Sequence, residues 1–154
     1  MSFELHHLLY VLADHLSDGI NPLFVGLIVQ EPLVAGQGKS AKSQIASALL
    51  FYLRSLLAVG IAVTLAELGK KHQIWPGHPY FPSGHTTFAA AAATCIVIQR
   101  GWGWAWMVVP LVLLMAGSLV YGRWHTLDEV AAAMLLGPLV AWWLMRVTSS
   151  WRGR

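Results

Sequence analysis

The sequence is poor in charge and almost free of cysteine. Only 11% of its 154 residues are charged, and the single cysteine, Cys95, lies in an apolar run. One cysteine cannot form a disulfide within the chain, so we expect Cys95 to pack as a small hydrophobic side chain. Soluble domains carry roughly 25% charged residues, and a small one has proportionally more surface to cover with polar groups. The shortage of charge therefore argues against a soluble domain.

Hydrophobic residues are abundant instead, at 56% of the chain. A membrane resolves this imbalance, because lipid covers the outer apolar surface, and we expect residues 1–154 to form a single membrane domain. The net charge of +3 is modest, whereas nucleic-acid binding would require a basic stripe interleaved with aromatic side chains. We therefore expect contact with membrane lipids and no nucleic-acid partner, and the oligomeric state is left open.

Three segments are long and apolar enough to cross a membrane: 44–68, 102–121 and 127–147. About 20 residues cross a typical hydrocarbon core, and each span must be helical because lipid cannot satisfy unpaired backbone groups. A fourth segment, 85–98, is shorter, and its run Ala89–Ala93 lets neighbouring backbones approach closely. It has polar ends or lies inside the bundle. The predicted fold class is all-α, a multi-pass transmembrane helical bundle.

The first 37 residues are harder to interpret. Residues 3–16 place leucines near one face and suit an amphipathic helix on the membrane surface. Residues 20–35 are apolar but contain Pro22 and Pro32, which favours either a short span or a re-entrant piece. Both alternatives remain open for this N-terminal region, and residues 44–147 form the expected core.

The loops differ in their basic residues, which predicts the orientation. One side collects Lys39, Lys42, Arg100, Arg146, Arg152 and Arg154. The other collects Lys70, Lys71 and Arg123, together with His72, His78, His85 and His125. Basic residues favour the cytoplasmic side, so we expect the histidine-rich side to face outward from a cell membrane, of the bacterial inner-membrane kind.

One polar patch on the histidine-rich side opens the fourth segment. Pro82 precedes Ser83, a good helix N-cap, and Gly84 lets the backbone come close to a ligand. The free N–H groups of a helix start favour an anion such as phosphate. His85 is then placed to donate a proton to a leaving oxygen. The alternative interpretation is a capped helix with a surface histidine.

A second patch begins the last segment. His125 and Glu129 are four residues apart, so they share one face of a helix and can touch. A carboxylate that holds one imidazole nitrogen leaves the other free as a nucleophile or base. A contact that only ties down a loop explains the spacing equally well. The histidine cluster has no short ligand pair of the kind that binds metal, so we expect no metal or other cofactor.

These patches, in this order, resemble the type 2 phosphatidic acid phosphatase family, the membrane relatives of the vanadium haloperoxidases. The family pattern is K-x6-R-P, then P-S-G-H, then S-R-x5-H-x3-D. This sequence reads Lys71-x6-His78-Pro79, then Pro82-Ser83-Gly84-His85, then Ser118-Leu119-x5-His125-x3-Glu129. The resemblance covers residues 44–147. It implies a haloperoxidase-like bundle with a shortened N-terminal region, and metal-independent hydrolysis of lipid phosphate esters or anhydrides near the outer membrane surface.

The resemblance also implies a role for each matching residue. Lys71 would bind phosphate oxygens, and Ser83 with the Gly84 amide would complete that cradle. His85 would be the general acid. His125 would attack phosphorus to form a phosphohistidine, and Glu129 would orient it in place of the family's aspartate.

The sequence departs from the family at both phosphate-binding arginines, which are His78 and Leu119 here. Neither side chain reproduces a charged, bidentate guanidinium. Arg123 is a substitute for one of them or an interfacial anchor, and Lys70 adds charge. Asp128 is a second candidate for the orienting carboxylate, although the helical spacing favours Glu129.

The predicted function is therefore a lipid phosphate phosphatase. Its substrate would be a lipid phosphate or pyrophosphate such as phosphatidic acid, phosphatidylglycerol phosphate or a polyprenyl pyrophosphate. The alternative is a catalytically weak relative that binds or carries a lipid phosphate without turnover, because both arginines are missing.

Overall fold

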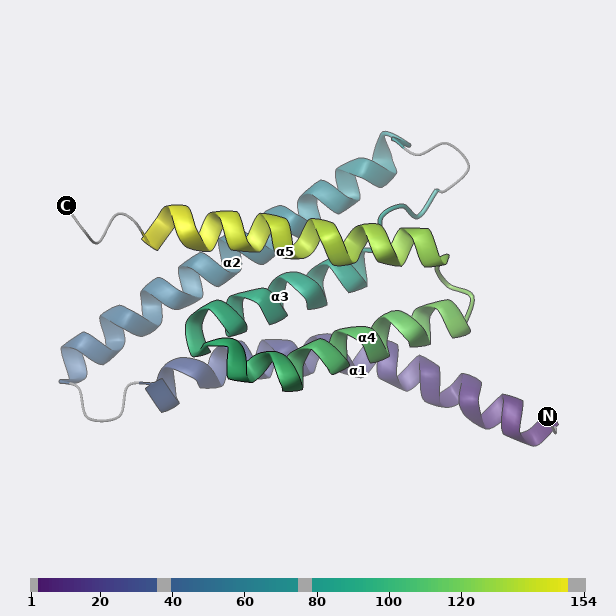
Figure 1. The fold of residues 1–154 in the computed structure, drawn as a ribbon, viewed down its shortest axis with the longest axis horizontal. Coiled ribbons are helices and arrows are strands. Elements are labelled where there is room, and N and C mark those ends of the chain that lie inside the picture. Colours follow the sequence, from purple (N-terminus) through teal and green to yellow (C-terminus); the bar gives the residue numbers. More distant parts are fainter. Residues whose placement is uncertain (1–2, 36–39, 75–78, 150–154) are drawn as a thin grey trace.

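The computed structural model describes residues 3–35, 40–74 and 79–149, and 89% of it is helical, with no strand in these ranges (Figure 1). This confirms the predicted all-α class. The five α-helices are α1 (Phe3–Ala35), α2 (Ala41–Lys71), α3 (Gly84–Arg100), α4 (Ala105–Tyr121) and α5 (Leu127–Ser149), and a short 3-10 helix, η1 (Trp102–Trp104), precedes α4.

The short helix α3 lies in the centre and contacts each of the other helices. Nearly all of its side chains from Thr86 to Ile96 are buried, including the whole run Ala89–Ala93. Its closest neighbour is α5, where a Cβ atom added at Gly137 would lie 2.6 Å from the carbonyl oxygen of Thr87. Small side chains on both helices permit this approach. Of the two alternatives for the fourth segment, polar ends or a place inside the bundle, the structure therefore shows the second.

Three stretches are long and apolar enough to cross a membrane: Ala41–Lys71, Trp102–Tyr121 and Leu127–Val147. They coincide with the three predicted spans. Only 28%, 33% and 28% of their most apolar windows are buried within the protein, so most of these apolar side chains face outward. On α2 alone the exposed large aliphatic residues are Ile45, Leu49, Leu53, Leu56, Leu57, Ile61, Leu65 and Leu68. Such a surface is stable in lipid, and the chain is a membrane protein.

The N-terminal region differs from the two separate pieces that its sequence favours. It is one continuous helix of 33 residues, and both Pro22 and Pro32 lie inside it. Tertiary contact accounts for this, because α1 packs along α4 and also against α3 and α2. Ile20 and Phe24, on either side of Pro22, are 4% and 0% exposed. Burial of these side chains offsets the backbone hydrogen bond that a proline removes.

The ends of the helices are sorted in space. The start of α1, the end of α2, the start of α3, the end of α4 and the start of α5 lie at one end of the bundle (Figure 1). This end, which we call the motif end from here, carries the described parts of the three stretches that match the family pattern, which lie within residues 71–79, 82–85 and 118–129.

Candidate active site

The start of α3 is built around Ser83, which is fully buried. Its hydroxyl accepts a hydrogen bond from the Thr86 amide at 3.4 Å and donates one to the Thr86 hydroxyl at 3.1 Å. The Ser83 side chain is thus turned into the helix as its N-cap. The amides of Gly84 and His85 occupy the first two helical positions, where an α-helix offers no internal acceptor. These two donors, rather than the Ser83 hydroxyl, are available to an anion in this structure.

The start of α5 shows the carboxylate half of a capping box. The Glu129 carboxylate accepts a hydrogen bond from the Thr126 amide at 3.1 Å, three residues earlier. The same oxygen, Oε2, lies 2.8 Å from Nδ1 of His125. Both side chains are shielded from solvent, with 11% of His125 and 3% of Glu129 exposed. The carboxylate bound to His125 therefore belongs to Glu129, the residue favoured by the helical spacing.

This contact defines the state of the imidazole. A carboxylate accepts a hydrogen bond, so Nδ1 of His125 carries the proton and Nε2 keeps its lone pair when the ring is neutral. The ring of Tyr80 meets the imidazole edge-on, with centroids 6.3 Å apart. His125 is therefore held in one tautomer and one orientation, as a nucleophile requires.

A direct hydrogen bond joins the two helix starts. The Ser83 amide donates to the backbone carbonyl of Glu129 at 3.1 Å. The residue that caps α3 is thereby anchored to the residue that orients His125. His85 is the second residue of α3 and His125 stands two residues before α5, so this bond between the helix starts brings both histidines to the same end of the bundle.

Position 119, where the family pattern has an arginine, is occupied by a core residue. The Leu119 side chain is 4% exposed and belongs to the hydrophobic core. Its carbonyl oxygen accepts hydrogen bonds from the amides of Trp124 at 3.1 Å and His125 at 3.3 Å. Leu119 thus holds the loop in place through its backbone and brings no charge to the site.

Helix α1 supports the loop that carries His125. Tyr10 packs against Trp124 with ring centroids 5.5 Å apart, and the Tyr121 hydroxyl lies 3.1 Å from Nδ1 of His6. Trp124 also covers Gly122, where an added Cβ would overlap its indole ring. Arg123, between them, has a φ of 60° and an exposed side chain, so it is accessible to solvent or lipid headgroups.

A polar pocket of about 260 Å³ lies beside His85, between α1, α2 and α3. Asn21, Glu67, Lys70 and Gly84 are among its lining residues. The Lys70 ammonium is 2.6 Å from the Glu67 carboxylate. A Cβ added at Gly84 would be 2.8 Å from that carboxylate and 3.1 Å from the ammonium. The ion pair of Glu67 and Lys70 therefore lies over the start of α3.

Lys71 is placed differently from Lys70. It is the last residue of α2, its side chain is exposed, and it does not line this pocket. His78 lies outside the described residues. Within residues 3–35, 40–74 and 79–149, no group of three or more histidine, cysteine, aspartate or glutamate residues is placed to hold a metal ion.

Three residues of the site were not found by sequence reasoning. Glu67 precedes Lys70 by three residues, a spacing that favours an ion pair on any helix and is not specific. Asn21 comes from α1, and only the fold brings it into the pocket beside His85. Tyr80 stands next to Pro79 in a loop, and only the folded chain brings its ring to His125.

The fold defines a helical membrane protein, and one end of its bundle carries a histidine held by a buried carboxylate. The family model described as the PAP2 superfamily matches residues 61–152. This match covers more than half of the chain and includes all three stretches that fit the family pattern. The chain therefore belongs to the PAP2 superfamily, and the sequence resemblance is confirmed. Membership supports phosphatase activity in general. Comparison with curated proteins and with solved structures finds no match.

Proposed function

We propose that the protein hydrolyses a lipid phosphate monoester or pyrophosphate through a phosphohistidine on His125. The observation that carries this proposal is the 2.8 Å contact between Nδ1 of His125 and the buried carboxylate of Glu129. A helix cap alone requires only the bond from Glu129 to the Thr126 amide. The second bond, to the imidazole, prepares Nε2 for attack and stabilises the positive charge that the ring gains.

The reaction runs in two steps. Nε2 of His125 attacks phosphorus, the bond to the lipid oxygen breaks, and His85 gives that oxygen a proton. His85 then takes a proton from water, the water oxygen attacks phosphorus, and the bond between phosphorus and Nε2 breaks to release phosphate. The amides of Gly84 and His85, the helix dipole and the Lys70 ammonium stabilise the charge on the phosphoryl oxygens. No metal ion takes part in this scheme.

The second candidate function is binding of a lipid phosphate without turnover. The buried, uncharged side chain of Leu119 favours it, because the family's arginine is not replaced at that position. Lys71 and Arg123, both exposed, can add charge from the α2 end and the α4–α5 loop.

The substrate class is phosphatidic acid, phosphatidylglycerol phosphate or a polyprenyl pyrophosphate. The basic loops at the other end of the bundle favour an extracytoplasmic active site.

The test is phosphate release by purified protein in detergent with each of these lipids, with and without a metal chelator. We expect release that survives the chelator, a phosphorylated intermediate stable in alkali and labile in acid, and loss of both in His125→Ala. His15→Ala removes an exposed histidine of α1 and is the matched control. Release that persists in His125→Ala excludes the histidine mechanism, whereas lipid phosphate binding without release establishes the second candidate.

A further inference from the structure

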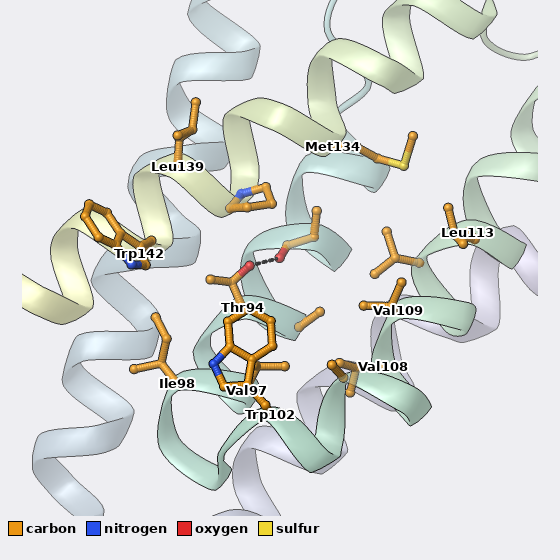
Figure 2. A pocket seen from close by; sticks show the side chains of 15 residues that line it. Thr94, Val97, Ile98, Trp102, Val108, Val109, Leu113, Met134, Leu139 and Trp142 are labelled. Carbon is orange, nitrogen blue, oxygen red and sulfur yellow. Dashed lines mark hydrogen bonds between the residues drawn. The ribbon is translucent and has the colours of Figure 1, made fainter.

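Two hollows in the described part of the chain differ in their chemistry. An apolar groove of about 450 Å³ lies between α4 and α5, with α3 as its floor (Figure 2). The hydroxyl of Thr94 in this groove is satisfied by the Ala90 carbonyl at 2.8 Å, and none of the lining residues belongs to the candidate active site. The polar pocket beside His85 is lined instead by an ion pair and by the start of α3. This second hollow is the one that can respond to a charged ligand.

The ion pair of the polar pocket joins Glu67 and Lys70, three residues apart on α2. The Lys70 ammonium donates to the Glu67 carboxylate at 2.6 Å. Within residues 3–35, 40–74 and 79–149 this ammonium makes no other hydrogen bond or ion pair. The Lys70 side chain is 22% exposed, whereas that of Glu67 is 57% exposed. The carboxylate can therefore turn into solvent with little loss of packing, while the ammonium stays in the pocket.

Both charged groups lie against the first residue of α3. A Cβ atom added at Gly84 would be 2.8 Å from the Glu67 carboxylate and 3.1 Å from the Lys70 ammonium. The amides of Gly84 and His85 are the donors that the proposed mechanism offers to phosphate. A carboxylate at this position repels a second anion, because the Coulomb energy grows as two like charges approach. Phosphate and the Glu67 carboxylate therefore compete for Lys70 and for the space over Gly84.

We propose that Glu67 is an internal competitor of phosphate at Lys70, displaced when the substrate binds and restored when phosphate leaves. The inference rests on the proposed function and adds a residue to its reaction cycle. In the empty site the carboxylate neutralises the ammonium. A phosphoryl group carries up to two negative charges at neutral pH, so it takes over the ammonium while Glu67 turns to solvent. After hydrolysis the carboxylate returns to Lys70 and removes one of the groups that hold the product.

This exchange resolves a conflict between binding and release. Inorganic phosphate has the same charged oxygens as the phosphoryl group of the substrate, so the same donors hold both. Release of product limits the rate of many enzymes. A competitor on the same helix is present at a high effective concentration at all times. Glu67 therefore weakens the binding of phosphate by a constant factor without the loss of any donor.

Glu67→Gln tests the inference, because it removes the charge and keeps the size of the side chain. Glu4→Gln is the matched control, since Glu4 is an exposed glutamate of α1 that does not line the pocket. Binding of inorganic phosphate to each purified protein in detergent is followed by phosphorus NMR, which requires no turnover. A competing charged hydrogen bond lowers affinity about tenfold, so we expect Glu67→Gln to lower the Kd for phosphate by that factor. Glu4→Gln should change the Kd less than about twofold, because salt screens a distant charge.

The outcomes separate this inference from the proposed catalysis. A Kd that is unchanged or raised in Glu67→Gln overturns the inference, as does an equal fall in Glu4→Gln or the absence of detectable binding in every protein. Tighter phosphate binding in Glu67→Gln without hydrolysis by any of the proteins leaves the role of Glu67 standing and refutes only the catalysis. In an active preparation, inhibition by inorganic phosphate becomes about tenfold stronger in Glu67→Gln, in line with its Kd.

The double variant Lys70→Ala/Glu67→Gln shows whether the competition takes place at Lys70. Without the ammonium there is no partner to compete for, and the exposed carboxylate is left screened by solvent. We therefore expect the Kd for phosphate in the double variant to lie within about threefold of that in Lys70→Ala alone. A tenfold difference between these two variants overturns the inference, because Glu67 then acts as a repelling charge that does not depend on Lys70.

Discussion

The starts of α3 and α5 meet at the motif end of the bundle but are built in opposite ways. At α5, His125 is largely shielded and its ring is held by the carboxylate of Glu129. At α3, the cap residue Ser83 is buried, but His85, two residues later, is exposed beside an open pocket. No hydrogen bond holds the His85 ring among the residues that the structure describes.

The difference fits two different tasks. A nucleophile must keep one nitrogen aimed at phosphorus, so rigidity and a defined tautomer favour it. A general acid must reach a leaving oxygen and exchange protons with water, so exposure favours it. The division of roles in the proposed mechanism therefore follows from the environments of the two rings. Substitutions at His85 and Glu129 test that division, and one at Lys70 tests the charge beside His85.

The largest expected effect is that of His85→Ala on substrates with a poor leaving group. Loss of a general acid costs roughly 10²- to 10⁴-fold in kcat for a lipid phosphate, because an alkoxide is a poor leaving group unless it is protonated. A nitrophenyl phosphate needs no proton on its leaving oxygen and should be affected far less. Steady-state kinetics with both substrates measure the ratio of the two losses in kcat. Equal losses on the two would show that His85 does not act as the acid.

The next effect is that of Glu129→Gln. Glutamine preserves the capping box but not the negative charge that supports His125. We expect kcat to fall about 10²-fold or more, because the amide does not stabilise the charge that His125 gains and can select the wrong tautomer of its ring, while thermal stability stays close to that of the unaltered protein. Glu129→Ala is the companion variant, because it also removes the cap and should cost about 1 kcal/mol of stability. Unchanged kcat in Glu129→Gln would reduce the His125 contact to a structural role.

The smallest effect separates the two lysines at the end of α2. Lys70 lies beside His85, whereas Lys71 is exposed outside the pocket. We expect Lys70→Ala to weaken inhibition by vanadate or inorganic phosphate about tenfold, because one charged hydrogen bond contributes about 1.5 kcal/mol or more. Lys71→Ala, the neighbouring control, should change the inhibition constant less than twofold. A larger effect of Lys71→Ala would mean that the end of α2 rearranges when phosphate binds.

Much of the fold could be predicted because its signals are local. Length and hydropathy suffice to find the spans 44–68, 102–121 and 127–147, since lipid demands continuous apolar helices of about 20 residues. The run Ala89–Ala93 indicated close packing of neighbouring backbones, and the short length of its segment left polar ends or a place inside the bundle as the alternatives. The contact of His125 with Glu129 followed from the geometry of a single helix turn.

The exceptions depended on neighbours distant in the sequence. Two prolines favoured a broken N-terminal region, yet packing on α4 and α3 keeps α1 continuous. Alignment with the family pattern assigned Leu119 to an arginine position, whereas the fold uses its side chain in the core and its carbonyl to hold His125. Neither the continuity of α1 nor the core position of Leu119 could be predicted from the residues next to it in the sequence.

The order of residues determines that this chain forms apolar helices, that a helix begins after Ser83 with free amides beside His85, and that Glu129 can reach His125. These follow from backbone geometry and hydropathy, which act over one helix turn or one span. Only the tertiary structure decides that the two helix starts are joined by the bond from Ser83 to Glu129, that Lys70 rather than Lys71 lies beside His85, and that α4 and α5 leave an apolar groove between them. Those outcomes depend on how helices cross, which is set by packing across the whole bundle.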